Sequence, residues 1–206
     1  MDFLIKAADS FVVENYDPNE TILHEGFGTL TIYWVLSGTI QANRSVPFLK
    51  KAINLGQNAM KHQLIAYDEK TMKPGPEDEI ITQKLVVQEL TQGENFPPFP
   101  IFDWSPFEST VTSMFDLEKY NDKIRRLRIS DPKAASPHTY VSQSAVTVAK
   151  IGLHEFTTHA DASLVLSFLK KNTELASLKQ IQDAYLEKIQ WQNFRKKVVD
   201  EVHGKK

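Results

Sequence analysis

The feature that most constrains this chain is an uncharged segment, residues 26–43, which contains no Asp, Glu, Lys or Arg. It reads Gly-Phe-Gly-Thr-Leu-Thr-Ile-Tyr-Trp-Val-Leu-Ser-Gly-Thr-Ile-Gln-Ala-Asn. Three structures compete for it: a β-hairpin, a short membrane span and a buried helix. The choice among them decides whether the chain is built around a small sheet, a bilayer or a helical core.

The hairpin interpretation rests on alternation. Over residues 29–36 every second residue is strongly apolar, a pattern that favours a half-buried strand. Ser37 and Gly38 follow as a two-residue turn. An isolated hairpin is only marginally stable without further strands, and we expect few strong strands elsewhere in the sequence.

The membrane interpretation rests on length and flanking charge. As a helix the segment would be about 27 Å long, close to the roughly 30 Å of a bilayer's hydrocarbon core. Residues 1–25 carry six acids and one lysine, whereas residues 44–66 carry four bases and no acid. The positive-inside rule would then place the C-terminal part in the cytoplasm or matrix. Tyr33 and Trp34 lie in the middle of the segment, whereas the aromatic belt residues of a membrane span lie near its two ends, so their position argues against a span. Hairpin and span stay open as equal alternatives, ahead of the buried helix.

Composition excludes several classes of protein. The 206 residues include no cysteine, which removes disulfide frameworks, iron–sulfur clusters and cysteine nucleophiles. The formal net charge of −2 argues against nucleic acid as a partner. The first residues do not form a secretory signal. We therefore expect an intracellular protein, in the cytoplasm or at an organelle inner membrane such as the mitochondrial one, and not a secreted one.

Helical spacing of apolar residues dominates the rest of the chain. It predicts helices over residues 3–16, 46–66, 77–92, 107–129, 159–171 and from Thr173 onward. A strand stays open for residues 77–92, and residues 140–151 fit either a strand or a helix. The predicted fold is mainly α, becoming α+β if a small hairpin forms at residues 29–43.

Three regions follow from this interpretation. Residues 1–25 form an N-terminal amphipathic helix and turn, and residues 26–43 form the uncharged segment, either membrane span or hairpin. Residues 44–206 form an α-rich domain. Its amphipathic helices are joined by an extended strap, residues 95–107.

The strap contains four prolines and five aromatic side chains. Its prolines impose an extended path, and such a path cannot bury five rings against itself. Each ring can bury on the order of 150–250 Å², so the strap lies along a surface of its own domain or of a partner. Two more aromatic residues belong to a basic C-terminal segment. The candidate partner-binding residues are Phe96, Phe99, Phe102, Trp104, Phe107, Trp191 and Phe194.

The densest group of metal-capable side chains is His154, Glu155, His159 and Asp161. A zinc helix of the His-Glu-x-x-His type needs its two imidazoles four residues apart, on one face. The spacing here is one residue longer, which turns the imidazoles about 140° apart on a helix. We therefore predict no catalytic residue, no metal ligand and no cofactor.

Apolar helix faces and an aromatic strap suit attachment better than catalysis. The sequence thus predicts a non-catalytic structural or accessory subunit of a larger intracellular, multiprotein assembly, with other protein subunits as its partners. That assembly is membrane-embedded if residues 26–43 span a bilayer. One alternative is a soluble metal-dependent hydrolase around His154 and His159. Another is a soluble module that binds an anionic partner, RNA or lipid, through a basic island at residues 119–133.

Overall fold

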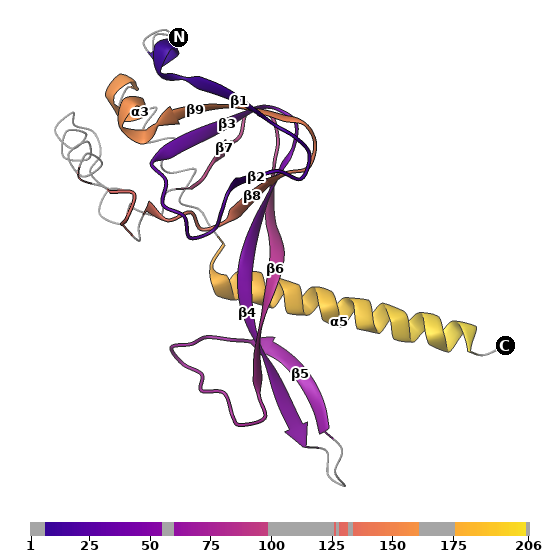
Figure 1. Ribbon diagram of the computed structural model, residues 1–206. Coiled ribbons are helices and arrows are strands. Elements are labelled where there is room, and N and C mark those ends of the chain that lie inside the picture. Colours follow the sequence, from indigo (N-terminus) through magenta and orange to yellow (C-terminus); the bar gives the residue numbers. More distant parts are fainter. Residues whose placement is uncertain are drawn as a thin grey trace, which may run out of the picture. The chain divides into compact units, whose positions relative to one another are not determined.

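The computed structural model describes residues 7–54, 60–98, 126, 128–131, 134–160 and 176–204. Within these residues the protein is predominantly β (Figure 1). The strands are β1 (Val12–Tyr16), β2 (Thr21–Leu23), β3 (Thr31–Ser37), β4 (Ile40–Asn54), β5 (Met60–Ala66), β6 (Glu79–Leu90), β7 (Asn95–Phe96), β8 (Thr139–Ser142) and β9 (Val146–Gly152). The helices are the short 3-10 helix η1 (Ala8–Ser10), α3 (Leu153–His159) and α5 (Leu178–His203).

The chain divides into two compact units. Unit 1 comprises residues 1–44 and 86–175, and unit 2 comprises residues 45–85 and 176–206. The long strands β4 and β6 each contribute residues to both units.

Unit 1 is built on two antiparallel sheets. The first sheet has the strand order β1-β9-β3-β7. The second sheet has the strand order β2-β8-β4-β5, and β6 pairs with β4 off this path. Buried residues of both sheets form one cluster, so the sheets pack face to face as a sandwich.

The chain crosses from the first sheet to the second at Gly38. This residue has a φ of +85°, a conformation that favours glycine. A Cβ atom at Gly38 would lie 2.4 Å from the carbonyl oxygen of Ala145, so a side chain there would collide with backbone.

The uncharged segment therefore forms strands and not a span. β3 pairs with β7 and β9, whereas β4 pairs with β5, β6 and β8. The hairpin interpretation is right about two strands and a turn at Ser37-Gly38, and wrong about their pairing. In the part of the chain that the structure describes, no helix has the length and apolar character needed to cross a bilayer.

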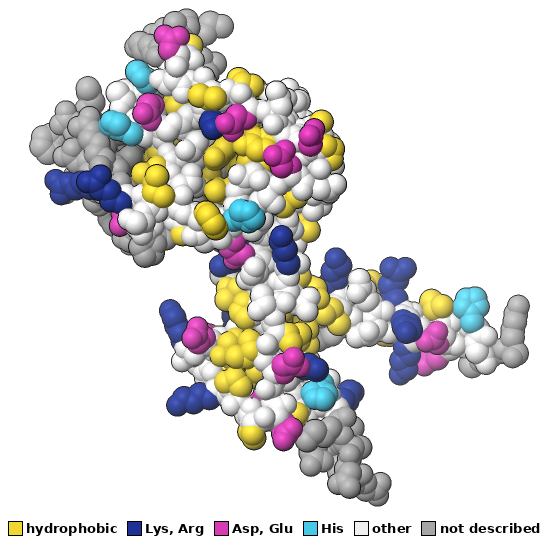
Figure 2. All heavy atoms as spheres, in the orientation of Figure 1, with side chains coloured by type: hydrophobic (Ala, Val, Ile, Leu, Met, Phe, Trp, Pro, Cys, Tyr) yellow, Lys and Arg dark blue, Asp and Glu magenta, His cyan; other side chains and the backbone are white. Residues whose placement is uncertain are grey.

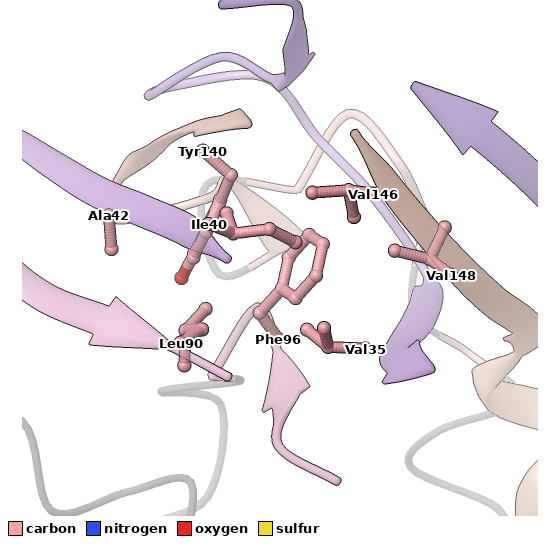
Figure 3. Packing of buried hydrophobic residues seen from close by; sticks show 8 residues of the cluster. All are labelled: Val35, Ile40, Ala42, Leu90, Phe96, Tyr140, Val146 and Val148. Carbon is pink, nitrogen blue, oxygen red and sulfur yellow. The ribbon is translucent and has the colours of Figure 1, made fainter. Parts of the chain in front are cut away.

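The core of the sandwich is centred on Phe96 of β7 (Figure 3). Its ring stacks on Tyr140, with ring centroids 4.6 Å apart, and on Tyr33, with centroids 5.0 Å apart. These three rings link β3 and β7 of the first sheet to β8 of the second. The other members of the cluster are Val35, Ile40, Ala42, Leu90, Val146 and Val148.

The opposite face of the first sheet is also covered. Trp34 packs against Phe11 on one side and Phe156 of α3 on the other, with ring centroids 5.8 and 5.7 Å apart. Ile32 and Leu153 are buried in the same unit. Strands β3 and β9 are therefore apolar on both faces.

Unit 2 contains residues 45–54 of β4 and 79–85 of β6, together with β5 and α5. The β4–β5 register runs without a break from Phe48 opposite Ala66 to Asn54 opposite Met60. The buried side chain of Gln182 donates to the carbonyl oxygens of Pro47, at 2.7 Å, and Tyr67, at 2.8 Å. A capping box at Ser177 begins α5.

The mainly α prediction is wrong, and on β4 the reason is that residues of both faces are buried. Residues 46–66 were expected as a helix and instead form most of β4 and β5, while residues 79–90 form β6. On β4, side chains of both faces are buried in places, which hides the period-2 alternation. The predicted last helix does form, as α5 from Leu178. The predicted helices at 107–129 and 159–171 fall largely outside the described residues.

Replacing Phe96 with alanine should lower the free energy of unfolding by about 3–5 kcal/mol, because the ring is 1% exposed and stacks on two others. The control is Phe27→Ala, at a ring that is 65% exposed, with an expected change of about 0.5 kcal/mol or less. Urea unfolding followed by circular dichroism measures both. Equal small effects at the two positions would contradict the placement of Phe96 in the core.

Candidate functional site

The inner face of the second sheet changes from apolar to basic along β4. Ile40 and Ala42 belong to the core cluster, and strand alternation places Arg44 on the same face. The register pairs Ala42 with Tyr140 and Asn43 with Thr139. Arg44 and His138 are the residues next to this last pair, and the positive charge of Arg44 contributes to lowering the pKa of His138. Two basic side chains thus adjoin an apolar surface.

His138 is held in place by the core. Its side chain is buried, with the residue 3% exposed, and its Nδ1 lies 3.3 Å from the hydroxyl oxygen of Tyr140. The Ser136 hydroxyl donates to the His138 carbonyl oxygen at 2.7 Å. Because Tyr140 itself stacks on Phe96, a continuous set of aromatic contacts fixes the imidazole at the polar end of the sandwich.

Burial sets the charge state of this group. Burial first, and the Arg44 cation second, lower the pKa of His138 to about 4, so its imidazole is neutral at pH 7. Burial also raises the pKa of Tyr140 well above its usual range, so its hydroxyl keeps its proton. At neutral pH, Arg44 is the charged member of the three.

Two of these polar groups lack a partner. Among the residues that the structure describes, neither Nε2 of His138 nor the guanidinium of half-buried Arg44 has a hydrogen-bond or ion-pair partner. Buried polar groups in folded proteins are almost always hydrogen-bonded. We call this pair the Arg44–His138 site. It is a candidate place in unit 1 for a ligand that accepts hydrogen bonds from these two side chains.

The residues predicted to bind a partner divide into three groups. Phe96 is buried in the core of unit 1. Phe99, Phe102, Trp104 and Phe107 lie outside the described residues. Trp191 and Phe194 stack on each other at 5.7 Å on α5 and are 59% and 56% exposed. Figure 2 shows basic side chains spaced along the same helix. Partner binding by Trp191 and Phe194 stays a prediction.

The metal-capable cluster does not come together in the described residues. His154 and Glu155 are exposed in the first turn of α3, and His159 ends that helix. Asp161 lies outside the described residues. Within them, no group of three or more His, Asp or Glu side chains could hold a metal ion. The hydrolase alternative thus finds no site there. Of the basic island 119–133, only residues 126 and 128–131 are described.

Sequence reasoning missed Arg44 and His138. The alternation of Ile40, Ala42 and Arg44 is visible in the sequence and could have placed Arg44 on the inner face of a strand. The pairing with residues near position 138 could not be read, because it joins segments about a hundred residues apart and depends on register.

Three comparisons place this chain among known proteins. No family model matches it, and no curated protein does. Among solved structures, a transcriptional regulator from Thermotoga maritima is 15% identical with a TM-score of 0.45, over 84% of this chain and 88% of that one. The regulatory domain of Toxoplasma gondii PKA with cAMP is 14% identical with a TM-score of 0.40, over 81% of this chain and 40% of that one.

A third similar structure is the c-di-GMP-responsive regulator CLP of Xanthomonas campestris. It is 10% identical with a TM-score of 0.41, over 82% of this chain and 55% of that one. The chain therefore spans about half of the length of this regulator and less than half of the PKA chain. These identities and scores do not assign a family.

Two functional expectations are corrected at this point. The prediction of a structural or accessory subunit in a membrane or mitochondrial assembly is wrong: residues 26–43, on which the membrane part of it depended, form strands of β3 and β4 and no span. The exclusion of nucleic acid as a partner is not upheld, since transcriptional regulators are among the matches. The prediction that the chain is not an enzyme stays a prediction. Phe96, one of the predicted partner-binding residues, is buried in the core of unit 1.

Protonation of His138 should make stability depend on pH. The pKa is about 4 in the folded chain and 6.5 for an unperturbed histidine, so the unfolded chain takes up the proton first as pH falls. The stabilisation is complete above pH 6.5 and is lost between pH 6.5 and 4, on the order of 3 kcal/mol in all. Tyr140, which contacts the ring, has a raised pKa and keeps its proton throughout this window.

Urea unfolding at pH 7 and pH 4.5 measures this effect. The wild type should lose more stability than His138→Gln between the two pH values. His154→Gln, which removes an exposed histidine of the same unit, should behave as the wild type does. A loss that is unchanged in His138→Gln would rule out His138 as its source.

Proposed function

We propose that unit 1 is a non-catalytic sensor domain, which binds a small molecule at the polar end of its sandwich and acts within an intracellular regulator. The observation that carries this proposal is the buried imidazole of His138, whose Nε2 has no partner among the described residues.

A buried polar atom without a hydrogen bond lowers the stability of a protein core. Leaving a buried polar atom without a hydrogen bond costs about 1–3 kcal/mol. Elsewhere the same interior is filled with Val35, Val146 and Val148, which incur no such cost. A few polar groups set at the end of an apolar interior are characteristic of small-molecule sites, where they orient the ligand.

The chemistry of the site favours binding over catalysis. A histidine with a pKa near 4 is a weak base at pH 7. The Ser136 hydroxyl donates to the His138 carbonyl oxygen, and within the described residues no basic side chain accepts its proton. The described residues thus provide recognition groups without a nucleophile–base pair.

Cyclic nucleotides are suitable first probes. The names of two similar structures mention cAMP and c-di-GMP, and both molecules combine planar bases with phosphates. Two uncharged molecules complete the panel. Adenosine carries a base without a phosphate, and glucose carries neither.

Thermal unfolding and isothermal titration with these four probes test the proposal. At least one probe should raise the melting temperature of the wild type by several degrees at a hundredfold excess over its Kd, which corresponds to about 2.7 kcal/mol. His138→Leu should weaken binding of that probe at least tenfold, and His154→Gln should leave it unchanged. Absence of binding by all four probes, or full binding by His138→Leu, would overturn the proposed function.

A further inference from the structure

We infer that the ligand of the Arg44–His138 site is an anion, whose negative group lies between the guanidinium of Arg44 and Nε2 of His138. This inference rests on the proposed function and extends it by naming the class of ligand, a small phosphate or carboxylate compound.

The first support is an uncompensated charge. Arg44 begins on the same strand face as Ala42, which is fully buried, and its own side chain is half-buried. In the described part of the chain it forms no ion pair, whereas Lys50 pairs with Glu79 and Lys150 with Glu14. Partial burial of a cation without a counter-ion is unfavourable. A bound anion removes that penalty.

The second support is the closeness of Arg44 to His138. The register pairs Asn43 with Thr139, and Arg44 and His138 are the next residues along the two segments. The positive charge of Arg44 also contributes to lowering the pKa of His138. A neutral imidazole next to a guanidinium offers an anion a hydrogen-bond donor and a positive charge at one place.

Both side chains also carry hydrogen-bond donors of a kind that binds anions. In the tautomer in which the Tyr140 hydroxyl donates to Nδ1, the ring proton is on Nε2 and Nε2 is a donor. Arginine presents a planar set of N–H donors that matches the two oxygens of a carboxylate or phosphate. A neutral histidine donor and an arginine fork together can satisfy an anion without a net excess of charge.

Isothermal titration with matched probes tests this inference. The anionic probes are inorganic phosphate, cAMP and c-di-GMP, and adenosine is the uncharged probe. An anionic probe should bind the wild type at least tenfold more tightly than adenosine does. Arg44→Gln should weaken its binding 10- to 100-fold, as expected for the loss of charge-assisted hydrogen bonds. Arg44→Lys should be intermediate, and Lys51→Gln, at an exposed lysine, should bind as the wild type does.

A second readout guards against misfolding of the variants. Circular dichroism should show that Arg44→Gln keeps the wild-type fold, and the nitrogen-15 shift of the His138 ring should move when the anionic probe is added. Equal binding of adenosine and cAMP, unchanged in Arg44→Gln, would overturn the anion assignment and leave the sensor proposal standing. Failure of every probe to bind the wild type would overturn both.

Discussion

Two sheets of unit 1 are held against each other by the stacking of Phe96 on Tyr140 and Tyr33. Phe96 comes from a strand of two residues, β7, which adds little backbone pairing of its own. Its ring nevertheless contacts both sheets, and aromatic stacking adds about 0.5–1.5 kcal/mol per pair to the burial of apolar area. Without that ring, Tyr140 would lose its stacking contact with Phe96. The position of His138 depends in turn on its contact with the Tyr140 hydroxyl.

The same packing explains how a polar group persists in the interior. The sandwich is filled with valine, leucine and isoleucine side chains up to Ala42 and Tyr140, and one step further along both strands it becomes basic. Strands β4 and β8 pair Ala42 with Tyr140 and Asn43 with Thr139, and Arg44 and His138 are the next residues along the two segments. A rigid apolar wall next to two hydrogen-bond donors is the arrangement by which proteins orient small ligands.

Sequence patterns were informative for features that depend only on residues close together in the chain. The turn at Ser37-Gly38, the strand alternation around Trp34 and the final amphipathic helix were all readable from neighbouring residues. Misassignments arose where both faces of a segment are buried, as on β4, since alternation then disappears and helical spacing fits equally well. Phe96 shows the same limit: a proline-flanked aromatic residue can line a partner's surface or a core, and composition does not distinguish them.

The sequence alone determined which side chains are present. It has no thiol, no charged residue at positions 26–43, a glycine at position 38, where backbone leaves no room for a side chain, and enough apolar residues for a core. Only the tertiary structure decided which strands pair, and thereby that Arg44 lies close to His138. The physical reason is that hydrogen bonding between strands is set by register between distant segments, and a shift of one residue would turn either side chain to the other face.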